Sequence, residues 1–144
     1  MKKSDDATRY FARRFTCSAA VFSAFSEELG LDADTARKVA CGFGAGVSKT
    51  GNICGAVCGA IMAIGLKFGK IEEADETATE KTRELVREFV RRFTEKNGSV
   101  NCTVLLGFDL GKPDEYEKAR ESGLFKNKCP GLVRDAADIL EEIL

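Results

Sequence analysis

Residues 42–66 read GFGAGVSKTGNICGAVCGAIMAIGL, a glycine-rich loop followed by an apolar stretch with two cysteines near its start. Asn52 is a good helix N-cap, so Cys54 is predicted in the first turn of a helix that runs to about residue 66. Unpaired backbone N–H groups and the positive end of the helix dipole favour an anionic sulfur there. We therefore expect Cys54 to be a thiolate, with Gly51 and Gly55 contributing to the site around it.

This predicted helix is apolar on nearly all sides and rich in glycine and alanine, which is typical of the central helix of a bundle. Neighbouring helices are expected to approach it closely at Gly55 and Gly59. Apolar residues at helical spacing predict further helices over about 4–28, from Asp32 or Asp34 to 41, and over about 72–96, 113–121 and 130–143. We predict an all-α fold: one domain over residues 1–144, a bundle of about five to six helices around the Gly/Ala-rich central helix.

Composition excludes several classes of protein. The chain has 144 residues and a net charge of −1, with positive and negative residues intermixed, so no nucleic-acid partner is expected. The apolar run over 53–66 is shorter than the roughly 20 residues that span a bilayer, so no membrane span is expected. The basic start resembles a leader peptide, but acidic residues interrupt it and no cleavage site follows. We expect a cytoplasmic protein.

Six cysteines in a chain without histidine require an explanation. They are Cys17, Cys41, Cys54, Cys58, Cys102 and Cys129. Cys129 precedes a proline and is predicted at the N-cap of the last helix; Cys102 is predicted to open a short turn. Cys17 is expected on the boundary face of the first helix. We hypothesise that several helix N-termini converge and lower the thiol pKa values, as a redox pair or a metal–sulfur site requires.

The residue types narrow the chemistry. Without histidine, a metal site made by this chain would be rich in sulfur, which favours an iron–sulfur cluster or structural zinc. Cys54 and Cys58 lie one helical turn apart and can face the same point, although a disulfide between them is awkward. Nucleotide binding by the loop is a weak hypothesis, because no strand precedes it and the P-loop spacing fails. A hydrolase with Cys54 as nucleophile lacks its usual histidine base.

The cysteine pattern resembles the C_GCAxxG_C_C family of redox-active proteins. That family has a lone cysteine, a Cys-Gly-Ala-x-x-Gly motif and two later cysteines, which here are Cys17, the motif at residues 54–59, Cys102 and Cys129. The resemblance implies that these four cysteines are redox-active; members of the family are often encoded near transporter genes. Cys41 and Cys58 lie outside the four-cysteine pattern.

The leading interpretation is a small redox protein in which Cys17, Cys54, Cys102 and Cys129 bind an iron–sulfur cluster or cycle between dithiol and disulfide. The alternative is a non-catalytic helical module that associates with a transporter component, its thiols packed as small hydrophobic groups or bound to zinc. These interpretations predict an iron–sulfur cluster, a zinc ion or no cofactor at all. The partner is an unidentified redox or transporter protein, and the Gly-rich core helix is compatible with a homodimer.

Overall fold

The computed structural model describes residues 2–144, and its regular elements are helices. In chain order they are α1 Lys3–Ala12, α2 Cys17–Ser26, α3 Ala33–Ala40, the 3-10 turn η1 Cys41–Phe43, α4 Gly44–Lys49, α5 Gly55–Phe68, α6 Glu76–Asn97, α7 Cys102–Leu106, α8 Pro113–Glu121, α9 Leu124–Asn127 and α10 Cys129–Ile143. The predicted all-α fold is confirmed. There are more helices than predicted, because short ones occupy segments that were expected to be loops and one predicted helix is divided in two.

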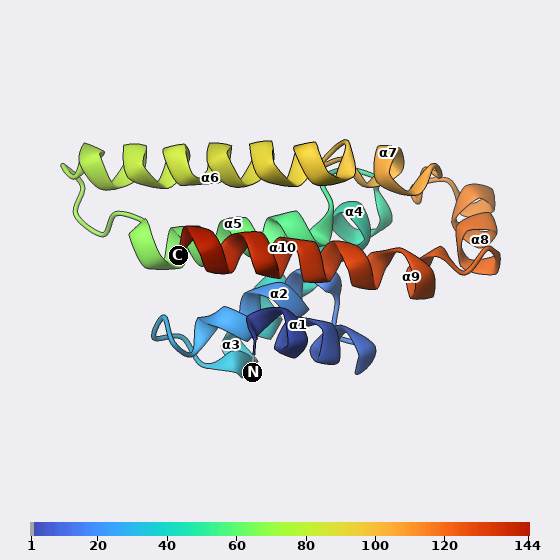
Figure 1. Ribbon diagram of the computed structural model, residues 1–144, viewed down its shortest axis with the longest axis horizontal. Coiled ribbons are helices and arrows are strands. Elements are labelled where there is room, and N and C mark those ends of the chain that lie inside the picture. Colours follow the sequence, from blue (N-terminus) through green and yellow to red (C-terminus); the bar gives the residue numbers. More distant parts are fainter. Residues whose placement is uncertain (1) are drawn as a thin grey trace.

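The helices form three layers (Figure 1). The long helix α6 makes one outer layer, α5 and α10 make the middle layer, and α1, α2 and α3 make the other outer layer. Helix α5 packs on α2 and α6, and α10 packs on α1 and α6. The predicted central position of the Gly/Ala-rich helix is therefore confirmed. Helices α7, α8 and α9 form an arm at one end of the molecule, between the end of α6 and the start of α10.

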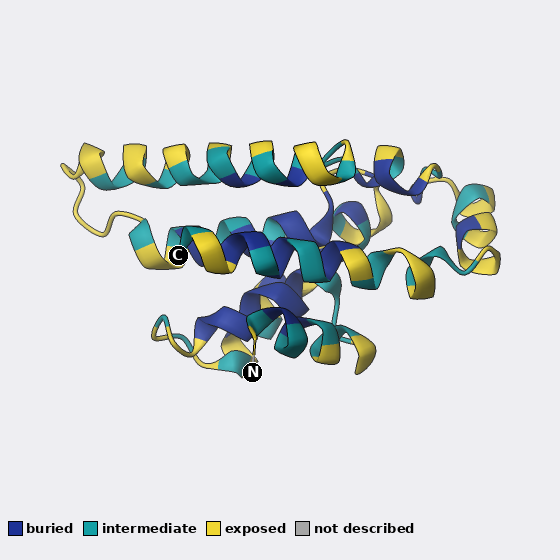
Figure 2. Cartoon of the chain, viewed as in Figure 1, coloured by how far each residue is buried: buried dark blue, intermediate teal, exposed yellow. Residues whose placement is uncertain are grey.

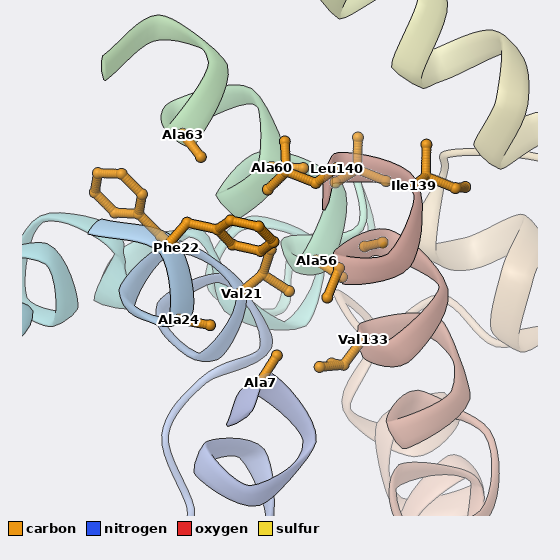
Figure 3. Close-up of a cluster of buried hydrophobic side chains, with 14 of the residues drawn as sticks. Ala7, Val21, Phe22, Ala24, Ala56, Ala60, Ala63, Val133, Ile139 and Leu140 are labelled. Atoms are coloured by element: carbon orange, nitrogen blue, oxygen red, sulfur yellow. The ribbon is translucent and has the colours of Figure 1, made fainter. Parts of the chain in front are cut away.

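Small side chains let the middle layer pack closely on its neighbours. Figure 3 shows Ala56, Ala60 and Ala63 of α5 among the same cluster of buried side chains as Val21 and Phe22 of α2. At Gly59 a Cβ atom would lie 2.5 Å from the Ser18 carbonyl oxygen, so only glycine fits this contact between α2 and α5. Buried residues concentrate in α2, α5 and the inner face of α10, as Figure 2 shows.

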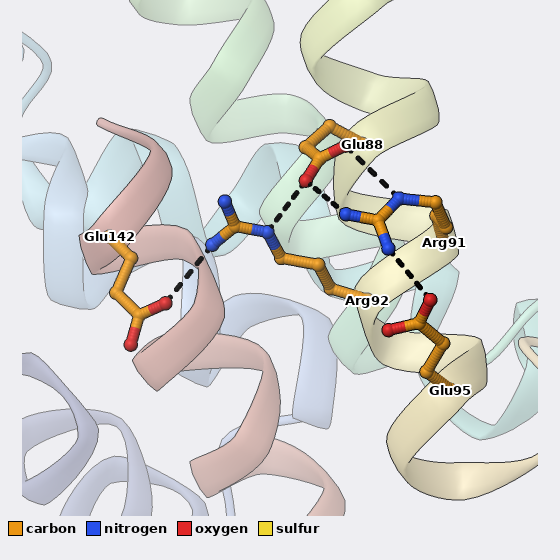
Figure 4. Close-up of polar contacts among 5 residues, drawn as sticks. All are labelled: Glu88, Arg91, Arg92, Glu95 and Glu142. Carbon is orange, nitrogen blue, oxygen red and sulfur yellow. Dashed lines mark hydrogen bonds and ion pairs between the residues drawn. The ribbon is translucent and has the colours of Figure 1, made fainter.

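Ion pairs join the outer helix α6 to α10 (Figure 4). Arg92 donates to Glu142 of α10 at 3.0 Å and to Glu88 of its own helix at 2.8 Å. Arg91 donates to Glu88 and Glu95. Hydrogen bonds from Arg91 and Arg92 lower the pKa of Glu88 to about 2. These charges lie on the solvent-facing side, so apolar packing carries most of the stability of this contact.

The single helix predicted over 4–28 is wrong, because the chain breaks there into α1 and α2. Arg14 has a left-handed φ of 72°, which no α-helix continues through. Thr16 then caps α2 by accepting a hydrogen bond from the Ala19 N–H at 3.2 Å. The break moves Cys17 from the middle of a helix to the first residue of one.

Two other helix starts can be compared with the N-caps predicted for them. Of the two predicted caps, Asp32 and Asp34, it is Asp32 that caps α3, by accepting a hydrogen bond from the Thr35 N–H at 2.9 Å. The N-cap of the central helix lies two residues later than predicted, at Cys54 and not at Asn52. Among residues 2–144, no helix combines the length and apolar character needed to cross a membrane.

Candidate functional site

A cavity of about 470 Å³ lies between α2, α5, α10 and the α7–α9 arm. Its walls include all four cysteines of the predicted site: Cys17, Cys54, Cys102 and Cys129. They come from four separate helices, since Cys17, Cys102 and Cys129 are the first residues of α2, α7 and α10 and Cys54 is the N-cap of α5. Four helix N-termini thus meet at one cavity. All six cysteines are free thiols.

A short antiparallel bridge between Ile53 and Asn101 joins the two segments that carry Cys54 and Cys102. The Cys54 N–H donates to the Val100 carbonyl at 2.8 Å, and the Cys102 N–H donates to the Asn52 carbonyl at 2.6 Å. Both segments immediately precede helices, so the bridge aligns the starts of α5 and α7. No sequence pattern marks this pairing, since each segment is too short to show strand alternation.

Two glycines make room for the sulfur atoms. A Cβ atom at Gly55 would collide with the Cys17 Sγ atom. At Gly46 a Cβ atom would lie 2.7 Å from the Cys102 Cβ and 3.1 Å from its Sγ. A glycine of the motif therefore makes room for Cys17, and a glycine of the loop before it makes room for Cys102.

Two residues of the predicted site lie outside the cavity. Gly51 does not line it; a Cβ atom there would instead lie 2.5 Å from Asp109 and 2.6 Å from Thr103, so this glycine permits a close loop contact. Cys58, one turn after Cys54, also does not line the cavity. Cys41, which the sequence left without a role, is exposed and does line it.

The segment α4, Gly44–Lys49, where a loop was expected before the central helix, is a left-handed turn and not a regular right-handed helix. Successive residues 45–49 have φ values of 59°, 67°, 67°, 51° and 63°, and only Gly46 among them is glycine. Each L-residue in this conformation costs about 1–2 kcal/mol. Hydrogen bonds hold the turn: Thr50 Oγ1 donates to the Val47 carbonyl at 2.7 Å, and the Asn52 N–H donates to the Gly46 carbonyl at 2.8 Å. Backbone strain of this size is characteristic of functional sites.

The expectation of a ready-made Cys54 thiolate is wrong for the metal-free protein. Burial raises the pKa of Cys54, and the charge of a neighbouring Cys17 thiolate raises it further. The backbone N–H groups of Val57 and Ala56 at the helix start act in the opposite direction but are outweighed. Cys54 is only 7% exposed, and removing a thiolate from water costs more than one helix terminus returns.

The other cavity thiols behave similarly. Burial raises the pKa of Cys102 to about 11 and that of Cys129 to about 12, and in each case the charge of Cys17 adds to the effect. The pKa of Cys17 is also raised by burial, but backbone N–H groups of Ala45 and Ser18 lower it. Cys17 therefore has several N–H groups directed at its sulfur, one of them from the left-handed turn.

The thiols do not form a site for a single metal ion as they stand. Among residues 2–144, no three acidic, cysteine or histidine side chains are grouped closely enough to hold one ion. A tetrathiolate zinc site holds four sulfur atoms at about 2.3 Å from one ion in tetrahedral geometry, and no such group is found among the described residues.

Comparison with known proteins gives a match to a family model. The model of the family described as "Putative redox-active protein (C_GCAxxG_C_C)" matches residues 15–143, nearly the whole chain. Neither the curated proteins nor the solved structures contain a significant match to the chain.

Proposed function

Because the chain belongs to the C_GCAxxG_C_C family of redox-active proteins, we propose that Cys17, Cys54, Cys102 and Cys129 bind an iron–sulfur cluster that transfers electrons. The observation that carries the proposal is the meeting of four cysteines, from four helix N-termini, at one apolar cavity. Sulfur is the only soft ligand that this set offers, and four thiolates are the usual ligands of such clusters.

The electrostatics support a cationic occupant. Burial raises the pKa of all four thiols, and the charge of Cys17 raises the pKa values of Cys54, Cys102 and Cys129 further, so the thiols stay protonated in a metal-free cavity. A metal ion removes the protons from the thiols that bind it and compensates the negative charges. The positive ends of the helix dipoles at all four cysteines then stabilise the bound thiolates.

The space around the cysteines also fits a cluster better than a single ion. The cavity of about 470 Å³ has room for more than one atom, and no three potential ligands among residues 2–144 are grouped for a single ion. Gly46 and Gly55 leave the sulfur atoms free of side-chain crowding. The N–H groups directed at Cys17 would stay with the bound thiolate, and hydrogen bonds to ligand sulfurs set the reduction potential of a cluster.

Thiol–disulfide cycling is the second candidate. Cys17 and Cys54 favour it, because the Cys17 sulfur lies against Gly55, next in the chain to Cys54, and the two thiols interact electrostatically. Oxidation would join the two sulfurs and pass two electrons and two protons to a disulfide of a partner protein. The raised pKa values and burial oppose this candidate, since attacking thiols are accessible and have lowered pKa values.

Either chemistry requires thiols that are kept reduced, so we propose a cytoplasmic location and a redox partner, with a transporter-associated protein as one form that partner takes. A helical module whose thiols are merely packed is the remaining alternative. It predicts neither metal nor a change in thiol count on oxidation.

Single Cys→Ser variants test the proposal, with Cys58→Ser, which does not line the cavity, as the matched control. Cys54→Ser and Cys102→Ser are each expected to lower bound iron and acid-labile sulfide about tenfold or more, while far-UV circular dichroism keeps the helical signal. Cys58→Ser should retain the metal. Unchanged iron in both Cys54→Ser and Cys102→Ser would contradict the proposal, and a metal-free protein that loses two titratable thiols on oxidation would support the second candidate.

A further inference from the structure

The cysteines occupy only part of the cavity wall. Cys102 belongs to a second hydrophobic cluster, separate from the main core, together with Leu106, Leu110 and the partly buried Tyr116 and Phe125. All of these side chains line the cavity. The cavity therefore extends from the sulfur atoms into the α7–α9 arm, where its wall is aromatic and aliphatic.

The size and lining of this space are those of a small-molecule site. The whole cavity, with its cysteine end included, measures about 470 Å³, within the roughly 300–1,000 Å³ that is usual for organic ligands, and such sites are mainly apolar with a few polar groups. Tyr116 and Phe125 have ring centroids 5.5 Å apart at an angle of 40°. Two such rings in one wall offer stacking surfaces to a flat apolar molecule.

One positively charged side chain lines this cavity. Among the described residues, Lys49 is the only charged one in the lining, and none of the ion pairs within residues 2–144 involves it. Its ammonium lies 4.2 Å from the centre of the Tyr116 ring. Lys49 is exposed and ends the left-handed turn, with a φ of 63°. The strained turn thus holds a cation at the edge of an apolar cavity, directly above an aromatic side chain.

We propose that the arm side of the cavity binds a flat, largely apolar organic molecule that carries one negative group. Its apolar body packs among Leu106, Leu110 and Phe125, and its anionic end pairs with Lys49. This proposal rests on the apolar lining and on Lys49. It can therefore be tested separately from the metal proposed for the cysteines. A ligand in this position lies against Cys102 and Cys129, which face the same space.

Two fluorescent probes of one ring system test the proposal on the full chain. Anilinonaphthalene sulfonate carries one negative charge, and phenylnaphthylamine has the same rings without it. Both are expected to bind once per chain, with dissociation constants on the order of tens of micromolar. Titrations are made well below the cooperative melting temperature, so that probe binding reports on the folded protein.

Lys49→Met is expected to weaken the sulfonate about two- to fivefold, the effect of one exposed ion pair, and to leave the neutral probe unchanged. Lys118→Met, on the exposed surface of α8 outside the lining, is the matched control and should change neither. Leu110→Phe narrows the cavity and should weaken both probes about tenfold. Absence of saturable binding by both probes, or equal effects of Lys49→Met and Lys118→Met on the sulfonate, would overturn the proposal whatever the iron content.

Discussion

At Gly55 a missing side chain leaves the space that the Cys17 sulfur occupies. We expect Gly55→Ala to displace this sulfur and lower iron content about tenfold or more, because positioning residues around metal sites affect affinity by about 10–100-fold. Gly65→Ala is the control: it lies in the same helix, and a Cβ atom there would meet nothing within 4 Å. The control should keep its metal and gain about 0.5–1 kcal/mol in the free energy of unfolding. Equal iron in both variants would show that the Gly55 contact does not shape the site.

The raised thiol pKa values make the stability of the metal-free, reduced protein depend on pH. An ordinary thiol pKa is 9.0, whereas Cys102 in the folded chain has a pKa of about 11. Its contribution to stability is therefore fully present below pH 9 and is lost as pH rises toward 11. Between these two pH values an unfolded chain has lost the thiol proton and the folded chain has kept it, so the free energy of unfolding falls by about 1.4 kcal/mol for each unit that pH rises. Urea denaturation at several pH values measures the slope, and Cys102→Ser should make it shallower; identical slopes would contradict the assignment.

At the scale of single elements, the left-handed turn is where local and overall requirements conflict. Ala45 has a φ of 59°, a conformation that glycine adopts without penalty. Ala45→Gly is expected to raise the free energy of unfolding by up to about 1 kcal/mol, because relief of about 1–2 kcal/mol of strain exceeds the entropy cost of glycine. Ala78→Gly in the right-handed helix α6 should instead lower it by about 1 kcal/mol. Urea denaturation of both variants measures the two changes. A lower free energy of unfolding in both variants would contradict strain at Ala45.

The elements also show what sequence can predict. The short helix α8 was predicted from a proline in its first turn, and its predicted bounds, Pro113–Glu121, hold. The break before Cys17 was missed because the apolar residues on both sides continue one helical pattern. Thr16 was the available signal: a good N-cap directly before the cysteine.

The candidate site was predictable only in part, for a physical reason. A cysteine that follows a capping residue can be placed at a helix start from local sequence, as Cys102 after Asn101 shows. Whether several helix starts meet depends on contacts between distant segments, such as the pairing of Cys54 with Val100. The pKa values likewise depend on burial, which only the folded chain defines.

At the scale of the whole molecule, the cysteine cavity lies where two hydrophobic clusters meet. Cys54 belongs to the main core, and Cys102 belongs to the smaller cluster of the arm. A metal bound by both would join the arm to the bundle. We therefore expect loading to raise the melting temperature, because a ligand that binds only the folded state stabilises it by about 4 kcal/mol at a thousandfold excess over its dissociation constant. Calorimetry before and after chelation measures the change, and equal melting temperatures would contradict a metal that links the two clusters.

The central claim is that the four cavity cysteines hold an iron–sulfur cluster. The most direct test is to purify the full chain without oxygen and to measure iron, acid-labile sulfide and the visible spectrum on the same sample. We predict stoichiometric iron and sulfide and a brown protein whose visible absorption bleaches on reduction. A colourless protein without iron, even after anaerobic reconstitution with iron and sulfide, would contradict the claim and leave thiol–disulfide chemistry as the better account.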